Sequence, residues 1–342
     1  MSPTAALRPA RAGGQAQPGV AAQPEGSHAV AVVELEDLRT RVEAELASFL
    51  DGRSALLHAL SPDLAGLADA ARDAVLGGGK RLRAAFCYWG LRAAGGESGV
   101  PAAVRAPAAL ELLQASALVH DDLMDRSDTR RGAPSAHRRF ADAHARAGWS
   151  GDPARFGGSA ALLLGDLLLS WSDELFSAAC APAPVPAPAR ALFDLMRTEV
   201  IAGQFLETVE AAAPADRARL VARYKSASYT VQRPLQLGAA LAGAEPALLE
   251  ALGGYALPLG EAFQLRDDVR DAAEDLREGR PTLLTTLGGT PADPGDLLDR
   301  AEARIGALRE SALTALAAAP LRDDSVRPVL HALAAAATAP RV

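Results

Sequence analysis

The stretch LVHDDLMDRSDTRRG, residues Leu118 to Gly132, decides how the rest of the chain is read. Three aspartates directly follow an apolar run, and two arginines come a few residues later: Asp121, Asp122, Asp125, Arg130 and Arg131. Acids this dense beside apolar residues form either a solvated helix end or a site for cations. The two interpretations differ in whether the carboxylates face water or a ligand.

The same D-D-x-x-D pattern occurs again far along the chain, in FQLRDDVRD, as Asp267, Asp268 and Asp271. In each cluster the first and last aspartates are four residues apart, which places both carboxylates on one face of a helix. Like charges at that spacing repel, and Mg²⁺ removes the repulsion because it prefers carboxylate, water and phosphate oxygens. A single cluster would favour a solvated helix end. Two clusters that both follow apolar residues favour paired Mg²⁺ sites with a polyanion between them.

The composition predicts an all-α protein. Apolar residues make up 49% of the 342 residues and aromatic residues only 4%. Alanine and leucine dominate and are strong helix formers, whereas strictly alternating β-branched runs are rare. Apolar periodicity and glycine- or proline-rich punctuation predict a first helix from Leu35 and further helices over 64–76, 80–95, 101–125, 158–180, 189–212, 216–229, 231–242, 246–272, 294–318 and 325–337.

Residues 1–30 are rich in Pro, Gly, Ala and Gln and lack periodicity. We therefore expect a disordered tail there, followed by a single helical domain over residues 31–342. The tail contains no continuous apolar segment of the secretory kind, so a signal peptide is not expected.

The net charge, the cysteines and the apolar segments indicate which partners and which compartment to expect. The net charge of −7 gives no general reason to bind nucleic acid. Cys87 and Cys180 lack metal-ligand spacing, which favours reduced thiols in a cytoplasmic protein. The apolar segment from Ala160 to Trp171 is too short to cross a membrane and contains Asp166, so no transmembrane segment is expected.

Only two of the 35 basic residues are lysines, and both lie where a phosphate group could use them. Lys80 stands in GGGKRLR with Arg83, where glycines precede a new helix whose first N–H groups are open to an anion. Lys225 stands in YKSASYT beside Ser226. Because an ammonium and a guanidinium are not interchangeable, the surviving lysines favour a specific use over chance. The glycine-lysine run is not a P-loop, since GxxxxGK[ST] is absent.

Taken in order, these motifs resemble those of the trans-type isoprenyl (polyprenyl) diphosphate synthases, the family of the farnesyl and geranylgeranyl diphosphate synthases. The resemblance runs from about Leu35 to Arg280 and rests on GGGKRLR, ELLQASALVHDDLMDRSDTRRGAPSAH, LLLGDLLL, GQFLE, YKSASYT and FQLRDDVRD. It implies a bundle of antiparallel helices around a deep central cavity, usually in a homodimer. It also implies that an allylic diphosphate, bound through Mg²⁺, ionises and is attacked by isopentenyl diphosphate, which lengthens the prenyl chain.

The resemblance implies a role for individual residues. Both clusters would bind about three Mg²⁺ ions per site once diphosphate is present, with Asp121, Asp125 and Asp267 as principal ligands and Asp122, Asp268 and Asp271 in support. The catalytic and allylic-diphosphate residues would be Arg130, Lys225, Ser226 and Gln264. The isopentenyl-diphosphate pocket would use Lys80, Arg83, Gln114 and Arg131. Gln114 lies two helical turns before Asp121, so we expect it to face the same cavity; a hydrogen-bonded core glutamine is the alternative for Gln114 and Gln264.

Product length is expected to depend on the residues about one turn before the first cluster. In the family the growing tail runs along this helix, and bulky side chains there stop its growth. Ser116 and Ala117 are both small, so we predict a C20 product, geranylgeranyl diphosphate. A deeper floor at Leu112 or Leu113 leaves farnesyl and longer-chain products as alternatives.

Departures from the family pattern leave other functions open. The segment AAEDLREGRPTLL after the second cluster is short and lacks the usual lysine that binds the allylic diphosphate. Arg270, where leucine is common, either compensates for that lysine or pairs with neighbouring acids. Ala84 and Glu207 replace the usual proline and aspartate. A weakly active regulatory subunit of a heteromeric synthase is therefore one alternative. A class I terpene cyclase is another, although DDVRD does not fit its second metal motif.

Overall fold

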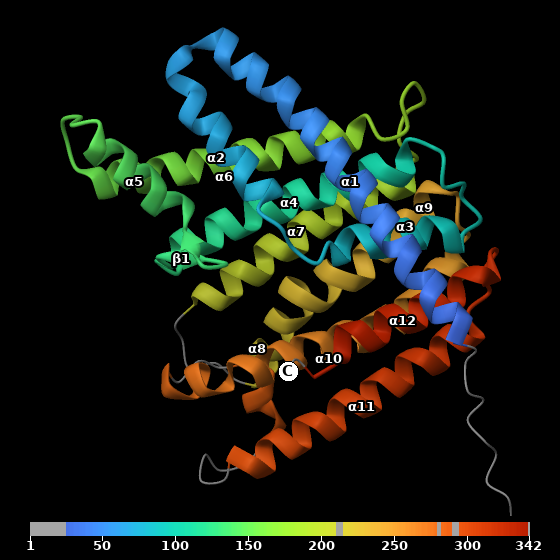
Figure 1. The fold of residues 1–342 in the computed structure, drawn as a ribbon. Coiled ribbons are helices and arrows are strands. Elements are labelled where there is room, and N and C mark those ends of the chain that lie inside the picture. Colours follow the sequence, from blue (N-terminus) through green and yellow to red (C-terminus); the bar gives the residue numbers. More distant parts are fainter. Residues whose placement is uncertain (1–24, 210–214, 279–281, 289–293, 341–342) are drawn as a thin grey trace, which may run out of the picture.

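The computed structural model describes residues 25–209, 215–278, 282–288 and 294–340. Helices fill most of these ranges (Figure 1). The α-helices are α1 (Glu25–Leu60), α2 (Ala65–Leu76), α3 (Leu82–Ala93), α4 (Ala102–Met124), α5 (Ala136–Arg146), α6 (Pro153–Ser177), α7 (Ala187–Thr208), α8 (Ala215–Val221), α9 (Arg233–Leu241), α10 (Pro246–Glu278), α11 (Pro294–Ala318) and α12 (Arg327–Thr338). The shorter elements are the 3-10 turns η1 (Pro62–Leu64), η3 (Leu284–Leu287) and η4 (Asp324–Val326), the π-helix η2 (Ala222–Gln232), and the antiparallel pair β1 (Thr129–Arg130) and β2 (Ala133–Pro134).

The predicted all-α fold is confirmed in the described ranges, with two differences in its elements. Helix α1 begins at Glu25 rather than near Leu35, so residues 25–30, expected in the tail, belong to a helix. Residues 1–24 lie outside the described ranges, and the rest of the predicted tail stays a prediction. Helix α5 was not expected, because its sequence AHRRFADAHAR is mostly polar and Phe140 is its one large apolar residue.

Helix α4, which ends at the first aspartate cluster, lies in the core. It packs against α1, α3 and α6, and residues along most of its length, such as Ala103, Leu110 and Leu112, are fully buried. By length and composition α4 alone among the described helices could cross a membrane, but 72% of its most apolar window is buried inside the fold. That burial is typical of a core helix. The first cluster therefore stands at the end of a helix that the core holds in place.

Two glycines allow α3 and α9 to cross with their backbones in contact. A Cβ on Gly90 would lie 2.0 Å from the carbonyl oxygen of Leu235, and a Cβ on Gly238 would lie 1.7 Å from that of Cys87. Any side chain at either position would force the helices apart. Because α9 continues directly from η2, this crossing also positions the π-helix that carries Lys225 and Ser226.

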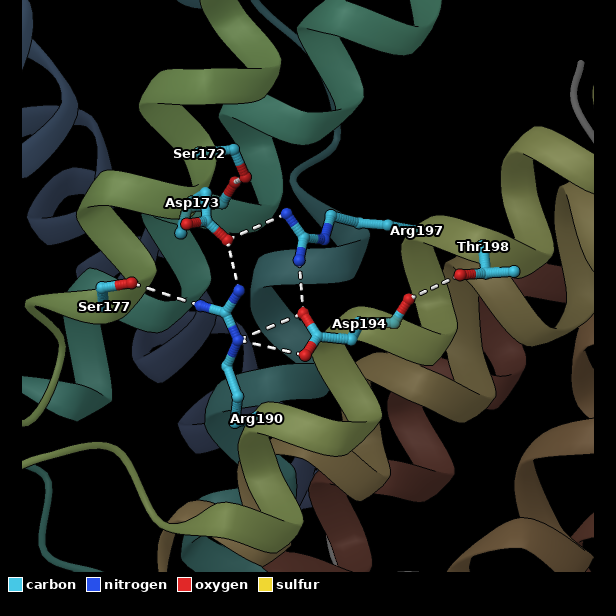
Figure 2. A network of polar contacts seen from close by, with 8 residues as sticks. Ser172, Asp173, Ser177, Arg190, Asp194, Arg197 and Thr198 are labelled. Carbon is cyan, nitrogen blue, oxygen red and sulfur yellow. Dashed lines mark hydrogen bonds and ion pairs between the residues drawn. The ribbon is translucent and has the colours of Figure 1, made fainter.

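A network of arginines and aspartates joins α6 to α7 (Figure 2). Arg190 and Arg197 donate to the same oxygen of Asp173, at 2.7 and 2.8 Å, and both also contact Asp194. Burial would raise the pKa of Asp194, but the hydrogen bonds from the two arginines lower it overall. The network therefore stays charged at neutral pH and holds α7, which carries Glu207 near its end, against α6.

The close crossing gives a test of the fold. Gly238→Ala is expected to lower the free energy of unfolding by about 2 kcal/mol, because the new methyl group overlaps the Cys87 carbonyl oxygen. Urea denaturation followed by circular dichroism measures the change. Gly306→Ala in α11 is the control, since nothing lies within 4 Å of its Cβ position. That substitution should stabilise the helix by about 0.5–1 kcal/mol. Equal effects of the two substitutions would contradict the crossing.

Candidate active site

The first aspartate cluster is held by cations from two other elements. Lys225 Nζ, on η2, donates to Asp121 Oδ1 at 3.0 Å and also contacts Glu207 on α7. Arg130, on β1, donates through Nε to Asp122 Oδ1 at 2.8 Å and through Nη2 to Asp121 Oδ2 at 3.3 Å. The cluster therefore brings together residues of α4, the β1–β2 hairpin, α7 and η2.

The cations in this cluster keep their charge. Burial would lower the pKa of Lys225, but the charges of Glu207 and Asp121 raise it overall. The pKa of Arg130 is likewise raised, because its contacts with Asp122 and Asp121 outweigh the effect of burial. Both side chains are therefore available as cations for a bound anion.

The hairpin after α4 places Arg131 against the glycine loop before α3. Arg131 has a left-handed backbone (φ 55°), and its guanidinium donates to the carbonyl oxygens of Gly77, at 3.3 Å, and Gly78. Burial and the nearby charges of Arg81 and Arg130 lower the pKa of Arg131. Arg130 and Arg131 line a cavity of about 360 Å³ between α2, α4, α5 and the hairpin. Crowded guanidinium groups at such a cavity favour the binding of an anion.

The other residues predicted to bind isopentenyl diphosphate each have their own contacts. Lys80 is exposed and lines a different cavity, between α1, α3 and α12. Arg83 donates to Thr230 Oγ1 at 2.8 Å and lies 4.4 Å over the ring of Tyr229. Gln114 has a buried side-chain oxygen without a hydrogen-bond partner in the described part of the chain. An orphaned acceptor of this kind is typical of a site that a ligand completes.

The second aspartate cluster, on α10, is bound mainly by residues near to it. Asp268 is buried and accepts hydrogen bonds from Gln264 Nε2, at 2.6 Å, and from the backbone N–H of Leu284, at 3.0 Å. Arg270 donates to Asp267 Oδ1 at 3.0 Å and to Asp271 Oδ1 at 2.7 Å. Of the two alternatives for Arg270, the structure shows pairing with the neighbouring acids. The hydrogen bond to Asp271 is the main reason that the pKa of Arg270 is raised.

The π-helix η2 connects the surroundings of the two clusters. It packs against both α7 and α10, and its residue Lys225 reaches Asp121 across 104 positions of sequence. Ser226, next to Lys225, is half-buried on the same element. π-helical turns are rare and occur frequently at functional sites. Its position therefore links residues that are far apart in the sequence.

Arginine and lysine side chains of the chain itself contact the carboxylates that were predicted to bind Mg²⁺. Within the described ranges no three His, Cys, Asp or Glu side chains are grouped as a metal site. Arg130, Lys225 and Arg270 instead contact the carboxylates. The donor chemistry nevertheless fits Mg²⁺, because both clusters offer hard carboxylate oxygens. Binding of the metal would require these cations to move off the aspartates, and the freed donors could then bind phosphate oxygens.

An apolar cavity of about 360 Å³ begins beside the first cluster, between α4, α6 and α7. Ala117 lines it, as predicted for a residue that controls product length. Ser116 does not line it: the hydroxyl donates to the carbonyl oxygen of Gly165 at 2.8 Å, and the residue is only 3% exposed. Of the two small residues, the structure therefore brings only Ala117 to the cavity. Leu112 and Leu113 are buried in the core.

The motifs did not reveal the residues that hold the arginines around the site. Arg81 is buried and pairs with Glu111 at 3.0 Å, and Arg83 is held by Tyr229 and Thr230 on η2. No local spacing in the sequence joins these partners, which are 30 and about 147 positions apart.

Comparisons with known proteins agree with this geometry. Residues 65–287 match the family model described as polyprenyl synthetase. A geranylgeranyl diphosphate synthase of Methanosarcina mazei is 31% identical over 258 residues, 69% of this chain and 71% of the relative. A (2E,6E)-farnesyl diphosphate synthase of Mycobacterium bovis is 33% identical over 224 residues, 61% of this chain and 56% of the relative.

One solved structure is similar to this protein over nearly the whole length of the solved chain. It is a geranylgeranyl pyrophosphate synthase of Corynebacterium glutamicum in complex with isoprenyl diphosphate and magnesium. The TM-score is 0.81 at 34% identity, covering 90% of this chain and 99% of the other. Both aspartate clusters and most of the residues around them lie inside the matched segment. The chain belongs to the polyprenyl synthetase family of prenyl-transferring enzymes.

Proposed function

We propose that the protein is an Mg²⁺-dependent prenyltransferase that condenses isopentenyl diphosphate with an allylic diphosphate, with geranylgeranyl diphosphate as its main product. The observation that carries the proposal is the pair of aspartate clusters, each neutralised by cations of the chain itself. Carboxylates for metal ions and cations for phosphate oxygens are the groups that a diphosphate leaving group requires. The names of the archaeal and corynebacterial relatives support the C20 product.

The residues of the chain have distinct tasks in this reaction. Mg²⁺, when bound, supplies charge that stabilises the departing diphosphate. Arg130 and Lys225 lie at the first cluster and would donate to phosphate oxygens once they leave Asp121 and Asp122. Arg131 would bind the second diphosphate from the glycine loop. The apolar cavity beside Ala117 would exclude water from the prenyl tail and its carbocation.

The rival functions are less well supported. A regulatory subunit would not need two complete aspartate clusters, each with its own cations. A terpene cyclase would need aromatic side chains around the carbocation. Phe205 is the one aromatic residue that lines the cavity at Ala117 in the described part of the chain, and it is 68% exposed.

We further propose a cytoplasmic homodimer. Large apolar side chains on α6 and α7 are exposed in the single chain, with Leu163 at 62%, Ile201 at 59% and Phe205 at 68%. Exposed apolar groups gathered on neighbouring helices are typical of a protein–protein interface. Both cysteines are free, which supports a reducing compartment.

The reaction itself is the first test. Purified protein with Mg²⁺, isopentenyl diphosphate and a farnesyl diphosphate primer should yield geranylgeranyl diphosphate, identified by chromatography. Asp121→Asn and Asp267→Asn should each reduce kcat by about a hundredfold or more, since each removes a carboxylate that would hold the metal charge acting on the leaving group. Asp142→Asn, in the exposed face of α5, is the control. Absence of product from every allylic primer would favour the regulatory subunit, and a cyclic hydrocarbon would favour the cyclase.

Product length gives a second test. Ala117→Phe should shift the product towards farnesyl diphosphate or shorter, because a phenyl ring would fill the apolar cavity beside the first cluster. Ser116→Ala should leave the product length unchanged, since Ser116 contacts Gly165 of α6 instead. The measurement is the distribution of product chain lengths at equal conversion of substrate. A shift caused by Ser116→Ala and not by Ala117→Phe would contradict the placement of the tail.

Arg270 gives a third test, of the requirement for metal. Because Arg270 holds Asp267 and Asp271, Arg270→Leu should lower the Mg²⁺ concentration at half-maximal thermal stabilisation by about two- to fivefold in the presence of inorganic diphosphate. Arg72→Leu is the matched control, because Arg72 is equally exposed and pairs with Asp51 on α1. A higher Mg²⁺ midpoint for Arg270→Leu would instead make Arg270 a ligand of the diphosphate.

A further inference from the structure

A large cavity in the described part of the chain lies outside the candidate active site. It measures about 930 Å³ and is formed by α8, η2, α10, η3 and α11; we call it the α11 cavity. None of its lining residues belongs to the aspartate clusters or to the substrate residues named above. Its size is within the range of small-molecule sites in proteins.

Positive charge predominates among the ionisable groups of the α11 cavity. Its charged lining residues are Arg219, Arg223, Arg304 and a single acid, Glu261. Arg304 pairs with Glu261 at 2.6 Å and Arg219 pairs with Asp216 at 3.2 Å, whereas Arg223 has no carboxylate partner among the described residues. Guanidinium groups are well suited to bind phosphate oxygens, and here no metal is needed to bring an anion in.

The remaining wall is mostly apolar. Leu283 and Leu308 are buried and line the cavity, together with Leu257, Pro258 and Leu287. Two hydroxyl groups, on Thr286 and Ser311, complete the lining. A basic group of residues beside an apolar wall fits an amphiphile with an anionic head and a hydrocarbon tail. Neither inorganic diphosphate nor a neutral lipid would use both parts.

Elements that line the α11 cavity also hold the candidate active site. Arg223 and Ala227 of η2 flank Lys225, which binds Asp121. Leu283 of the cavity wall is next to Leu284, whose N–H holds Asp268. A ligand in the cavity would therefore contact residues that are neighbours in sequence of Lys225, which binds the first cluster, and of Leu284, which binds the second.

We propose that the α11 cavity binds a long-chain prenyl diphosphate at a second site, outside the candidate active site. The proposal rests on the proposed function, since the product of that reaction is a molecule of this class. The head group lies against Arg223, Arg219 and Arg304, and the tail lies along the leucines of α10, η3 and α11.

Binding without metal is the decisive experiment. Calorimetry with geranylgeranyl thiolodiphosphate, a non-ionisable analogue, is performed on the full chain in EDTA and below the micellar concentration of the analogue. EDTA removes the metal-dependent binding at the aspartate clusters, and one site per chain is expected in the α11 cavity. The variants below separate binding in this cavity from binding to the cations around Arg131. Inorganic diphosphate and geranylgeraniol, each alone, should bind at least about tenfold more weakly, since each lacks one half of the interactions. No binding in EDTA, or equal binding of either fragment, overturns the proposal.

Two variants locate the site. Arg223→Gln should weaken binding in EDTA by about tenfold, the effect of losing a charge-assisted hydrogen bond. Ala307→Trp, which adds an indole from the exposed face of α11 into the cavity, should also weaken it. Arg309→Gln, on α11 but outside the cavity, is the matched control. Unchanged binding in both cavity variants overturns the proposal. If the wild-type protein forms no product with Mg²⁺, that result contradicts only the proposed function.

Discussion

The interaction on which the site depends is the neutralisation of two groups of carboxylates at helices packed in an apolar core. Asp122 and Asp268 are each only 4% exposed, and a buried charge without a partner would cost several kcal/mol. Arg130 satisfies Asp122, while Gln264 and a backbone N–H satisfy Asp268. Arg130 at Asp122 and the neutral donors at Asp268 therefore satisfy the buried carboxylates in the absence of metal, and the cations around the clusters are also donors that a diphosphate would need.

The same requirement explains the arrangement of the surrounding elements. The hairpin after α4 returns Arg130 to the cluster, and η2 brings Lys225 to it from the middle of the chain. The glycine-mediated crossing of α3 and α9 fixes the end of η2, so backbone contacts far from the carboxylates help to place the lysine. Arg270 serves the second cluster in the same manner but lies on the same helix as its acids. Before metal binds, the first cluster must be released by side chains from two other elements, whereas the second must be released by Arg270 of its own helix.

The sequence predicted the helices and the chemistry of the clusters, but not the partners. Apolar composition was sufficient for α4 and α10; in α4 the consecutive residues 106–113 are all buried. It failed for α5, where AHRRFADAHAR is mostly polar, and it could not show that η2 is a π-helix. The contacts of Ser116 with α6 and of Arg83 with Tyr229 depend on tertiary packing, which local spacing does not encode. Lys80 directly follows the glycine loop that Arg131 contacts, and it also lines a second cavity that its neighbours in the sequence did not indicate.

The central claim is that both aspartate clusters act on one ligand. A double-mutant cycle with Asp125→Asn and Asp271→Asn tests it most directly, with calorimetric binding of a non-ionisable allylic thiolodiphosphate in Mg²⁺ as the measurement. If both clusters hold metal ions on the same diphosphate, the two losses of binding free energy should be coupled by more than about 0.5 kcal/mol. Losses that add to within about 0.3 kcal/mol would show independent sites and would contradict the account.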